Sequence, residues 1–437
     1  MSAQIVAPFT NSTAKSGGHR KCSFATHQVL MKALSWSRDS HGLFDFESKN
    51  LTKKRMNANE PSLFLRSGNE VVQAQYDDKQ SLQEQKLLNS KVDGDQALVK
   101  VVSYNGYMYV ESAAYVQHQV DLDLKKEAGS TKLQENMYLV VRSLKHNDVR
   151  QHYDIQEKDI LKIGRIKFAV TEIGYSAESQ EMVADESEEM NEKGHTANSV
   201  FSSNNDEEWE EFEEVDSIVE GGQGGDKICR FCYSDEASDE NPLLRSCKCG
   251  GSVGYIHLGC LKQWLNFKMT KQQTSEGFTS IFWKAFECEI CKRAYPLTFK
   301  AQNKKYNLVE YEKPTGDYLV LESLSHEKNS SRIIHIIKPT ALKAEFKLGR
   351  GHNADLRIND ISVSRVHSMI KLLNGKFILE DNDSKFGTMV LVKQRTPLLP
   401  LYNKAVQVGR TVINFCAKEL KTVEPKGDEI RETQDSD

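Results

Sequence analysis

Four closely spaced pairs of metal-ligand residues constrain this chain more than any other feature of its 437 residues. The pairs are, in chain order, Cys229-x2-Cys232, Cys247-x-Cys249, His257-x2-Cys260 and Cys288-x2-Cys291, with gaps of 14, 7 and 27 residues between them. Two thiolates, or a thiolate and an imidazole, at this spacing reach the same ion, and eight such ligands complete two tetrahedral Zn²⁺ sites. No ligand is left over, so we expect two structural zinc ions and no catalytic residue.

The cysteine count and the overall composition bound the kind of protein. Nine cysteines, seven of them between Cys229 and Cys291, favour a metal site over a disulfide framework and predict a reducing intracellular compartment, cytoplasmic or nuclear. Hydrophobic residues make up 38% and charged residues 27%, and the mean hydropathy is −0.57. Such a composition favours small domains on polar linkers over one large enzyme core, and no apolar run is long enough for a membrane span.

An acidic block interrupts the chain. Residues 177–226 contain 17 Asp or Glu and one Lys, although the net charge of the whole chain is only −4. A segment of this kind repels itself, which predicts an extended, disordered linker; the alternative is a tail that competes for basic surfaces. Nucleic acid and membrane are not expected partners of the near-neutral chain.

The texture of the sequence divides the rest of the chain into β-rich and polar regions. Alternating Val, Tyr and Ile residues, punctuated by turn residues, predict strands on both sides of the cysteine cluster. DILKIGRIKFAV (159–170) echoes AVQVGRTVINF (405–415), and YLVVRSL (138–144) echoes YLVLESL (318–324), which indicates either two related β domains or the coincidence of β-rich sequence. The expected divisions are 1–95 largely disordered, 96–176 a small β domain, 177–226 the linker, 227–300 a zinc finger, 316–418 a β-sandwich and 419–437 a disordered tail.

The cysteine cluster resembles the RING-CH, or RING-variant, zinc finger. Besides the ligand order, the phrases CRFC, NPLLRSCKCGGSVGYIHLGCLKQWL and FECEICKRAYP carry the resemblance, while the 27-residue gap departs from it and suggests an inserted loop. The resemblance implies a cross-brace in which Cys229, Cys232, His257 and Cys260 hold one zinc ion and Cys247, Cys249, Cys288 and Cys291 hold the other. A PHD finger, which reads histone tails, has the same ligand order and remains the alternative.

RING-type fingers dock a ubiquitin-conjugating enzyme charged with ubiquitin and act by positioning the thioester, with no nucleophile of their own. By resemblance, the docking groove would consist of Phe231, Trp264 and Pro296. Phe231 lies between two ligands and is expected to face solvent, whereas core packing between the zinc loops is an equal alternative for Trp264.

A second constellation, at 346–390, resembles the forkhead-associated (FHA) domain. The blocks that carry the resemblance are Gly349-Arg350, Ser364-Arg365-Val366-His367 and the stretch from Asp381 to Thr388. FHA domains bind phosphothreonine peptides, which implies phosphate-binding roles for Arg350, Ser364, Arg365 and Lys385. Guanidinium and ammonium groups with a hydroxyl suit a phosphate, and His367 is expected to support the loop rather than touch the ligand.

One residue departs from the FHA pattern. Phe386 stands where the family usually has an asparagine that holds the peptide backbone, which puts peptide affinity and register in doubt. The 96–176 segment resembles the closing strands of an FHA-like sandwich without the phosphate-binding blocks. If it is FHA-like it is degenerate, and a scaffold role is expected.

The fold expected from these features is multidomain and mainly β, with a small zinc-stapled α+β finger of the cross-brace RING-CH type and an FHA-type β-sandwich. The expected function is that of a soluble RING-CH ubiquitin ligase that recruits a charged conjugating enzyme and selects phosphothreonine-containing partners. A non-catalytic, zinc-stabilised phosphopeptide adaptor is the alternative, and a chromatin reader is a third hypothesis.

Overall fold

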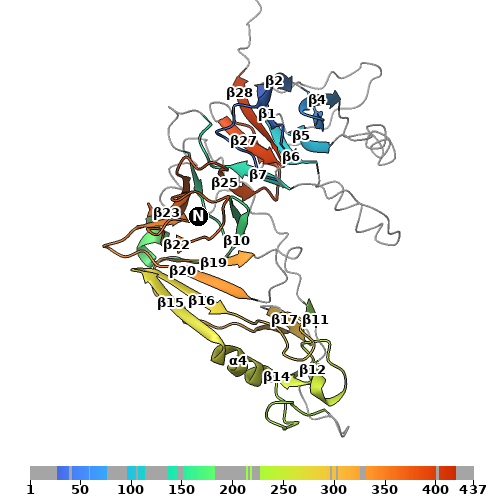
Figure 1. The fold of residues 1–437 in the computed structure, drawn as a ribbon, viewed down its shortest axis with the longest axis vertical. Helices are drawn as coiled ribbons and strands as arrows, with labels where there is room; N and C mark the ends of the chain where they lie inside the picture. The colour runs from blue at the N-terminus through green and yellow to red at the C-terminus, as the bar shows by residue number, and fades with distance from the viewer. Residues whose placement is uncertain are drawn as a thin grey trace, which may run out of the picture.

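The structure is a computed structural model that describes much of the chain. The described residues are 27–38, 42–58, 60–75, 96–104, 107–113, 136–144, 151–182, 213–214, 217–218, 227–295, 298–301, 304–324, 331–399 and 403–419. They form a mainly β protein in which two β units lie beside each other and a finger extends from one of them (Figure 1). No helix among these described residues is long and apolar enough to cross a membrane.

The N-terminal unit is built from both ends of the chain. Phe64, Val99 and Val110 lie in its core beside Ile413 and Phe415 from the C-terminal end. Its strands are β1 His27–Trp36, β2 Leu51–Ala58, β3 Ser62–Ser67, β4 Glu70–Gln75, β5 Gln96–Tyr104, β6 Tyr107–Ser112, β7 Met137–Val140, β26 Thr396–Pro397, β27 Asn403–Val408 and β28 Thr411–Glu419.

The C-terminal unit is likewise assembled from two separate segments. Phe346, Ile370 and Phe377 share its core with Leu161 and Phe168, which lie far upstream in the chain. Its strands are β8 His152–Asp154, β9 Ile160–Ile163, β10 Ile166–Gly174, β19 Tyr318–Leu324, β20 Arg332–Ile337, β21 Glu345–Gly349, β22 Leu356–Arg357, β23 Ser368–Leu373, β24 Lys376–Asp381 and β25 Thr388–Leu391.

The two units have the same strand order, and they exchange their closing strands. From each side towards the central β7–β25 pair, the large sheet runs β2-β1-β28-β27-β7 and β20-β19-β10-β9-β25. The smaller sheets, β4-β3-β5-β6-β26 and β22-β21-β23-β24-β8, also correspond. In each unit the last strands therefore come from the chain segment that builds the other unit, an exchange like that of domain-swapped dimers.

Turn geometry explains why the exchanged hairpins are equivalent. The β9–β10 and β27–β28 turns both contain Gly-Arg, and Gly164 and Gly409 have φ angles of 60° and 54°, which glycine adopts without strain. The echo between residues 159–170 and 405–415 thus corresponds to equivalent hairpins. The second echo does not, because YLVVRSL contains β7 whereas YLVLESL is β19, the counterpart of β1.

The finger is inserted between β10 and β19. A short 3-10 helix, η1 (Gly251–Gly254), and helix α4 (Leu258–Phe267) lie near its ligands, and Leu258, Leu261 and Leu265 are the buried face of α4. Its strands are β11 Glu213–Glu214, β12 Ser217–Ile218, β13 Leu243–Leu244, β14 Ile256–His257, β15 Met269–Ser275, β16 Phe278–Trp283, β17 Thr298–Ala301 and β18 Lys304–Asn307.

The domain divisions expected from the sequence differ from the structure in four places. Residues 27–75 were expected to be largely disordered, but they contain four strands. Strands that lie later in the chain complete their sheets, since β1 pairs with β28 and β3 pairs with β5. Neither the 96–176 segment nor the 316–418 segment is one domain by itself, since the strands of each are shared between the two units. Within the acidic segment, residues 177–182 are helical, and residues 213–214 and 217–218 pair with finger strands. The expected disorder of 1–26, 183–212 and 420–437 concerns residues outside the described ranges.

A matched pair of core substitutions tests the strand exchange. Phe168 on β10 and Ile413 on β28 occupy equivalent positions, and each is about 1% exposed. Phe168→Ala should expose the backbone amides of β19–β24 to hydrogen exchange, whereas Ile413→Ala should expose those of β1–β6, each with a loss of about 2–5 kcal/mol of stability. Hydrogen–deuterium exchange with mass spectrometry measures both. If Phe168→Ala instead exposed β1–β6 and Ile413→Ala exposed β19–β24, each hairpin would belong to the unit built from its own segment of the chain.

Candidate functional site

Two groups of four metal-ligand side chains converge in the finger. The ligand atoms within each group all lie within 4.8 Å of one another. One group is Cys229, Cys232, His257 and Cys260, and the other is Cys247, Cys249, Cys288 and Cys291. The groups alternate along the chain, which confirms the cross-brace and accounts for every cysteine between residues 229 and 291.

The two Cys-x2-Cys turns have the same local geometry. Tyr233 and Lys292, each one residue beyond the second cysteine, have positive φ angles of 59° and 58°. The N–H of Tyr233 donates to the carbonyl of Cys229 at 2.8 Å, and that of Lys292 donates to the carbonyl of Cys288 at 3.0 Å. Each turn therefore folds back on its first ligand and presents two sulfur atoms to one point.

The donor sets fit two zinc ions. His257 Nδ1 lies 3.2 Å from Cys232 Sγ, so the imidazole nitrogen and the thiols face a common centre. Three cysteines with one histidine, and four cysteines, are both ligand sets of structural tetrahedral zinc. Bound by these side chains, the ions would stabilise the finger, and each group of four would fill all the positions of one tetrahedral ion.

Arg230, which the sequence analysis did not single out, ties the two metal sites together. It belongs to the first turn, but its guanidinium lies 3.6 Å from Cys288 Sγ and 3.8 Å from Cys247 Sγ in the second site. It also donates to the Tyr295 hydroxyl at 3.2 Å and pairs with Glu289 at 3.2 Å. The only sequence signal was its position between two ligands.

In the second site the electrostatics favour thiolate at Cys288, whereas burial raises the pKa of Cys247 and raises the pKa of Cys249 to about 12. Burial raises the pKa of the Cys288 thiol, but the backbone N–H groups of Cys291 and Ile290, the Cys247 thiol and the Arg230 guanidinium outweigh burial and lower it to about 6. A thiol with this pKa is mostly deprotonated at neutral pH, which is the form that binds zinc.

Two of the three docking residues expected from the sequence, Phe231 and Trp264, lie next to each other. Phe231 and Trp264 have ring centroids 6.2 Å apart, and Lys268 Nζ lies 3.7 Å from the Trp264 centroid. The expectation that Phe231 faces solvent is wrong, because its ring is half-buried against α4 and the finger core. Pro296 lies outside the described residues.

The residues expected to bind phosphate lie on three loops that meet. Arg350 N–H donates to the Ser364 carbonyl at 3.0 Å, Gly351 N–H donates to the Arg365 carbonyl at 2.9 Å, and Lys385 N–H donates to Ser364 Oγ at 3.2 Å. Arg350, Arg365 and Lys385 are exposed. Across the described ranges, neither arginine's guanidinium has an ion-pair partner.

Buried side chains hold these loops in place. His367, fully buried, accepts the Ser364 N–H at Nδ1 (3.0 Å) and faces the Gly387 carbonyl with Nε2 (3.1 Å), in the supporting role expected for it. Burial lowers the pKa of His367, so the neutral ring that makes these two contacts is favoured. Asp381 accepts hydrogen bonds from Ser384 and Thr388, at 2.5 and 2.6 Å.

The exchanged hairpin also supports the site. Arg165, in the β9–β10 turn, donates its N–H to Ser362 Oγ at 2.9 Å and pairs with Asp360 at 3.2 Å. A Cβ at Gly164 would lie 2.4 Å from Ser362 Oγ, so the turn is packed directly on this loop. Sequence reasoning missed this support because the two segments are about 200 positions apart.

The N-terminal unit covers part of the loop that carries Lys385. Phe46 N–H donates to the Lys385 carbonyl at 3.0 Å, and Asp45 lies 3.5 Å from Lys385 Nζ. The Phe386 ring, which replaces the expected asparagine, packs 6.4 Å from the Trp36 ring. The departure at Phe386 therefore has a structural role in joining the two units.

Comparison with known families agrees with both resemblances. Residues 229–291 match the RING-variant domain, and residues 346–408 match the FHA domain. The RING-variant match disfavours the PHD alternative. The FHA match spans β21–β27, although in the structure β27 lies in the N-terminal unit.

Several curated ubiquitin ligases are similar to a part of this chain. The mouse (Mus musculus) E3 ubiquitin-protein ligase MARCHF7 is 36% identical over 73 residues, 17% of this chain and 10% of that protein. The Caenorhabditis elegans E3 ubiquitin-protein ligase marc-3 is 30% identical over 129 residues, 28% and 25% of the two chains. The yeast ERAD-associated E3 ubiquitin-protein ligase DOA10 is 36% identical over 75 residues, 16% and 5%. The chain thus spans a quarter or less of these relatives, and no solved structure matches it.

Metal analysis tests the two sites. The chain should bind two zinc ions per molecule, and Cys247→Ser should retain about one, because it removes a ligand of the second group only. Cys416→Ser, at the isolated cysteine on β28, is the matched control and should retain both ions. Inductively coupled plasma mass spectrometry gives the stoichiometry. A single zinc ion in the unsubstituted protein would contradict the assignment.

Proposed function

We propose that the chain is a RING-CH-type ubiquitin ligase that docks a charged ubiquitin-conjugating enzyme on the finger. The RING-variant match and the two closed four-ligand sites support this, with the aromatic pair Phe231 and Trp264 as docking residues and Pro296 as a third from the sequence. All finger cysteines serve as ligands, so none is free as a nucleophile. The finger would therefore act by holding the thioester in a reactive geometry.

The second part of the proposal is that the FHA region selects phosphothreonine-containing partners. The FHA match and the meeting of three loops support it, with Arg350, Ser364, Arg365 and Lys385 as phosphate-binding residues. Exposed cations beside the Ser364 hydroxyl suit a doubly charged phosphate. Because Lys385 already lies 3.5 Å from Asp45, a bound phosphate would compete with that carboxylate.

One observation favours the adaptor alternative, in which the finger is only a scaffold. Lys268 lies over the Trp264 ring and Phe231 is half-buried, so both aromatic residues have intramolecular partners. An aromatic pair with such partners is explained by packing alone. Docking and packing give different results when Phe231 is replaced.

A substitution at Phe231 separates ligase from adaptor. Phe231→Ala should leave both zinc ions bound, yet lower the discharge of ubiquitin from a charged conjugating enzyme about thirtyfold, the effect of losing about 2 kcal/mol at an interface hot spot. A discharge assay with a panel of conjugating enzymes, together with metal analysis, measures both quantities.

The control for this experiment is Tyr104→Ala, a half-exposed aromatic residue on β5 of the N-terminal unit, which should leave discharge unchanged. If the unsubstituted protein accelerates discharge from no carrier, or if Phe231→Ala keeps full activity with zinc bound, the adaptor function takes the place of the ligase function.

A charge substitution tests phosphate recognition. Arg350→Ala should weaken binding of a phosphothreonine peptide by roughly 10- to 100-fold, because a charge-assisted contact is worth about 1.5–3 kcal/mol. Arg55→Ala removes an exposed arginine from β2 in the other unit and should have no effect. Fluorescence anisotropy with phosphorylated and unphosphorylated peptides gives the affinities. Equal affinity of the two peptides for the unsubstituted protein would show that the site is vestigial.

A further inference from the structure

The long gap between Cys260 and Cys288 contains a hairpin that joins the finger to the C-terminal unit. After α4, β15 runs away from the metal sites and the antiparallel β16 returns towards them. β16 pairs with β20 over six residues, from Phe278 opposite Ile337 to Trp283 opposite Arg332 (Figure 1). The hairpin thereby extends the sheet that carries the FHA region. It is the insertion that departs from the ordinary RING-CH spacing.

The hairpin belongs to the cores of both parts. Trp283 and Ile281 pack in the finger's core, which also includes Val320, Ile334 and Ile336 of the C-terminal unit. At the other end of β16, Phe278 lies in the core of that unit, 6.5 Å from the Phe346 ring. Rotation of the finger about the hairpin would expose these buried surfaces to water, which opposes such motion.

Polar contacts fix the same junction. His335 on β20 bridges Ser280 on β16 at 2.8 Å and Ser323 on β19 at 3.0 Å. Burial lowers the pKa of His335 to about 4, so the ring is neutral at physiological pH. Arg332 donates to the Tyr295 carbonyl of the finger at 3.2 Å.

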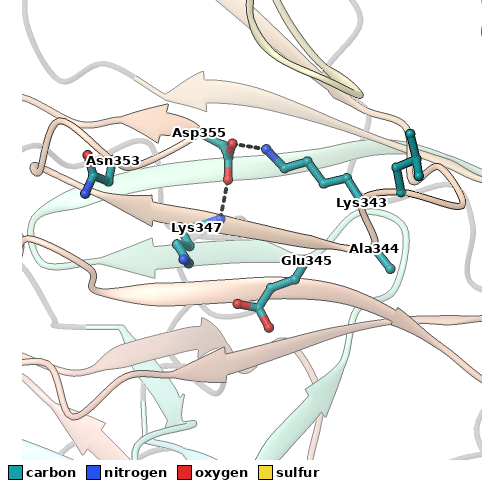
Figure 2. A pocket seen from close by; sticks show the side chains of 7 residues that line it. Lys343, Ala344, Glu345, Lys347, Asn353 and Asp355 are labelled. Carbon is teal, nitrogen blue, oxygen red and sulfur yellow. Dashed lines mark hydrogen bonds and ion pairs between the residues drawn. The ribbon is translucent and has the colours of Figure 1, made fainter.

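The tip of the hairpin reaches the loop that carries Arg350. Thr274 donates to the Asp355 carbonyl at 2.9 Å, and Ser275 donates to Asp355 Oδ1 at 2.6 Å. Asp355 in turn accepts the Lys347 N–H at 2.8 Å and pairs with Lys343 (Figure 2). The Gly349–Asp355 loop is thus anchored to the hairpin at its end.

We propose that this hairpin is a stiff spacer between the phosphothreonine site and the docked conjugating enzyme, so that the substrates are phosphoproteins whose modified lysine lies at a restricted distance from the phosphothreonine. The inference rests on the proposed function. Seven residues of β15 span roughly 20 Å. A flexible linker would sample a broad range of separations, whereas a paired and packed hairpin holds one.

The experiment uses the full chain and a series of peptides with one phosphothreonine and one lysine, separated by about 3 to 30 residues, or roughly 10–100 Å of extended chain. In the test variant, Gly/Ser segments are inserted after Thr270 and after Phe282, which leaves most of β16 on β20 but frees the finger. The control carries the same total insertion after Gly222, in the acidic segment. Zinc content and phosphopeptide affinity establish that both sites remain intact in each protein.

The unsubstituted protein and the control should ubiquitinate peptides of one narrow spacing about tenfold better than the others, and the test variant should show differences of only about twofold. Discharge to free lysine should be equal in all three. If the double insertion loses zinc, the insertion after Phe282 alone provides the comparison. If the unsubstituted protein also ubiquitinates peptides of all spacings at rates within about twofold of one another, the proposed role of the hairpin as a spacer is overturned, but the ligase function is not. No transfer to any phosphorylated peptide overturns the spacer, and if the unsubstituted protein also shows no discharge to free lysine, the ligase function is overturned with it.

Discussion

Two antiparallel pairings, β10 with β19 and β28 with β1, determine which strands complete which half of the protein. Each pairing joins segments far apart in sequence and closes a core that neither segment could close alone. The loops proposed to bind phosphate depend on the first pairing, because it places the Gly164–Arg165 turn against Ser362. The finger also depends on the β10–β19 pairing, because β20 pairs with β19 and β16 of the finger pairs with β20.

The two four-ligand groups and the three loops of the FHA region could be predicted because the residues that define each lie close together in the sequence. A Cys-x2-Cys turn or the stretch from Ser364 to His367 has its geometry within a few residues. The strand exchange could not be predicted, since residues 159–170 and 405–415 are alike and either hairpin satisfies the alternation of either sheet. The strands at 27–75 were missed for a related reason: β2 buries only Ala58 fully, so its sequence has little apolar alternation.

Packing between the units explains the residue that departs most from the FHA pattern. Phe386 lies near Trp36, and Gly387, with a φ of 75°, lies so close to Phe46 that a Cβ would be 2.6 Å from that ring. The loop therefore has two roles, contact with the N-terminal unit and presentation of Lys385. In the proposed function, other residues of these loops would have to hold the peptide backbone, because the Phe386 side chain packs at the interface between the units.

The separation between partner strands has a consequence for synthesis on the ribosome. Ser35 and Thr411, which are hydrogen-bonded at 3.1 Å, are 376 positions apart. At about 5–20 residues per second, β1 leaves the ribosome roughly 20–75 s before the strand that covers its edge. During that interval the finger can fold around its zinc ions, since all its ligands lie within one short stretch. The first strand meanwhile presents an open edge to other nascent chains, and a chaperone that shields it would act before translation ends.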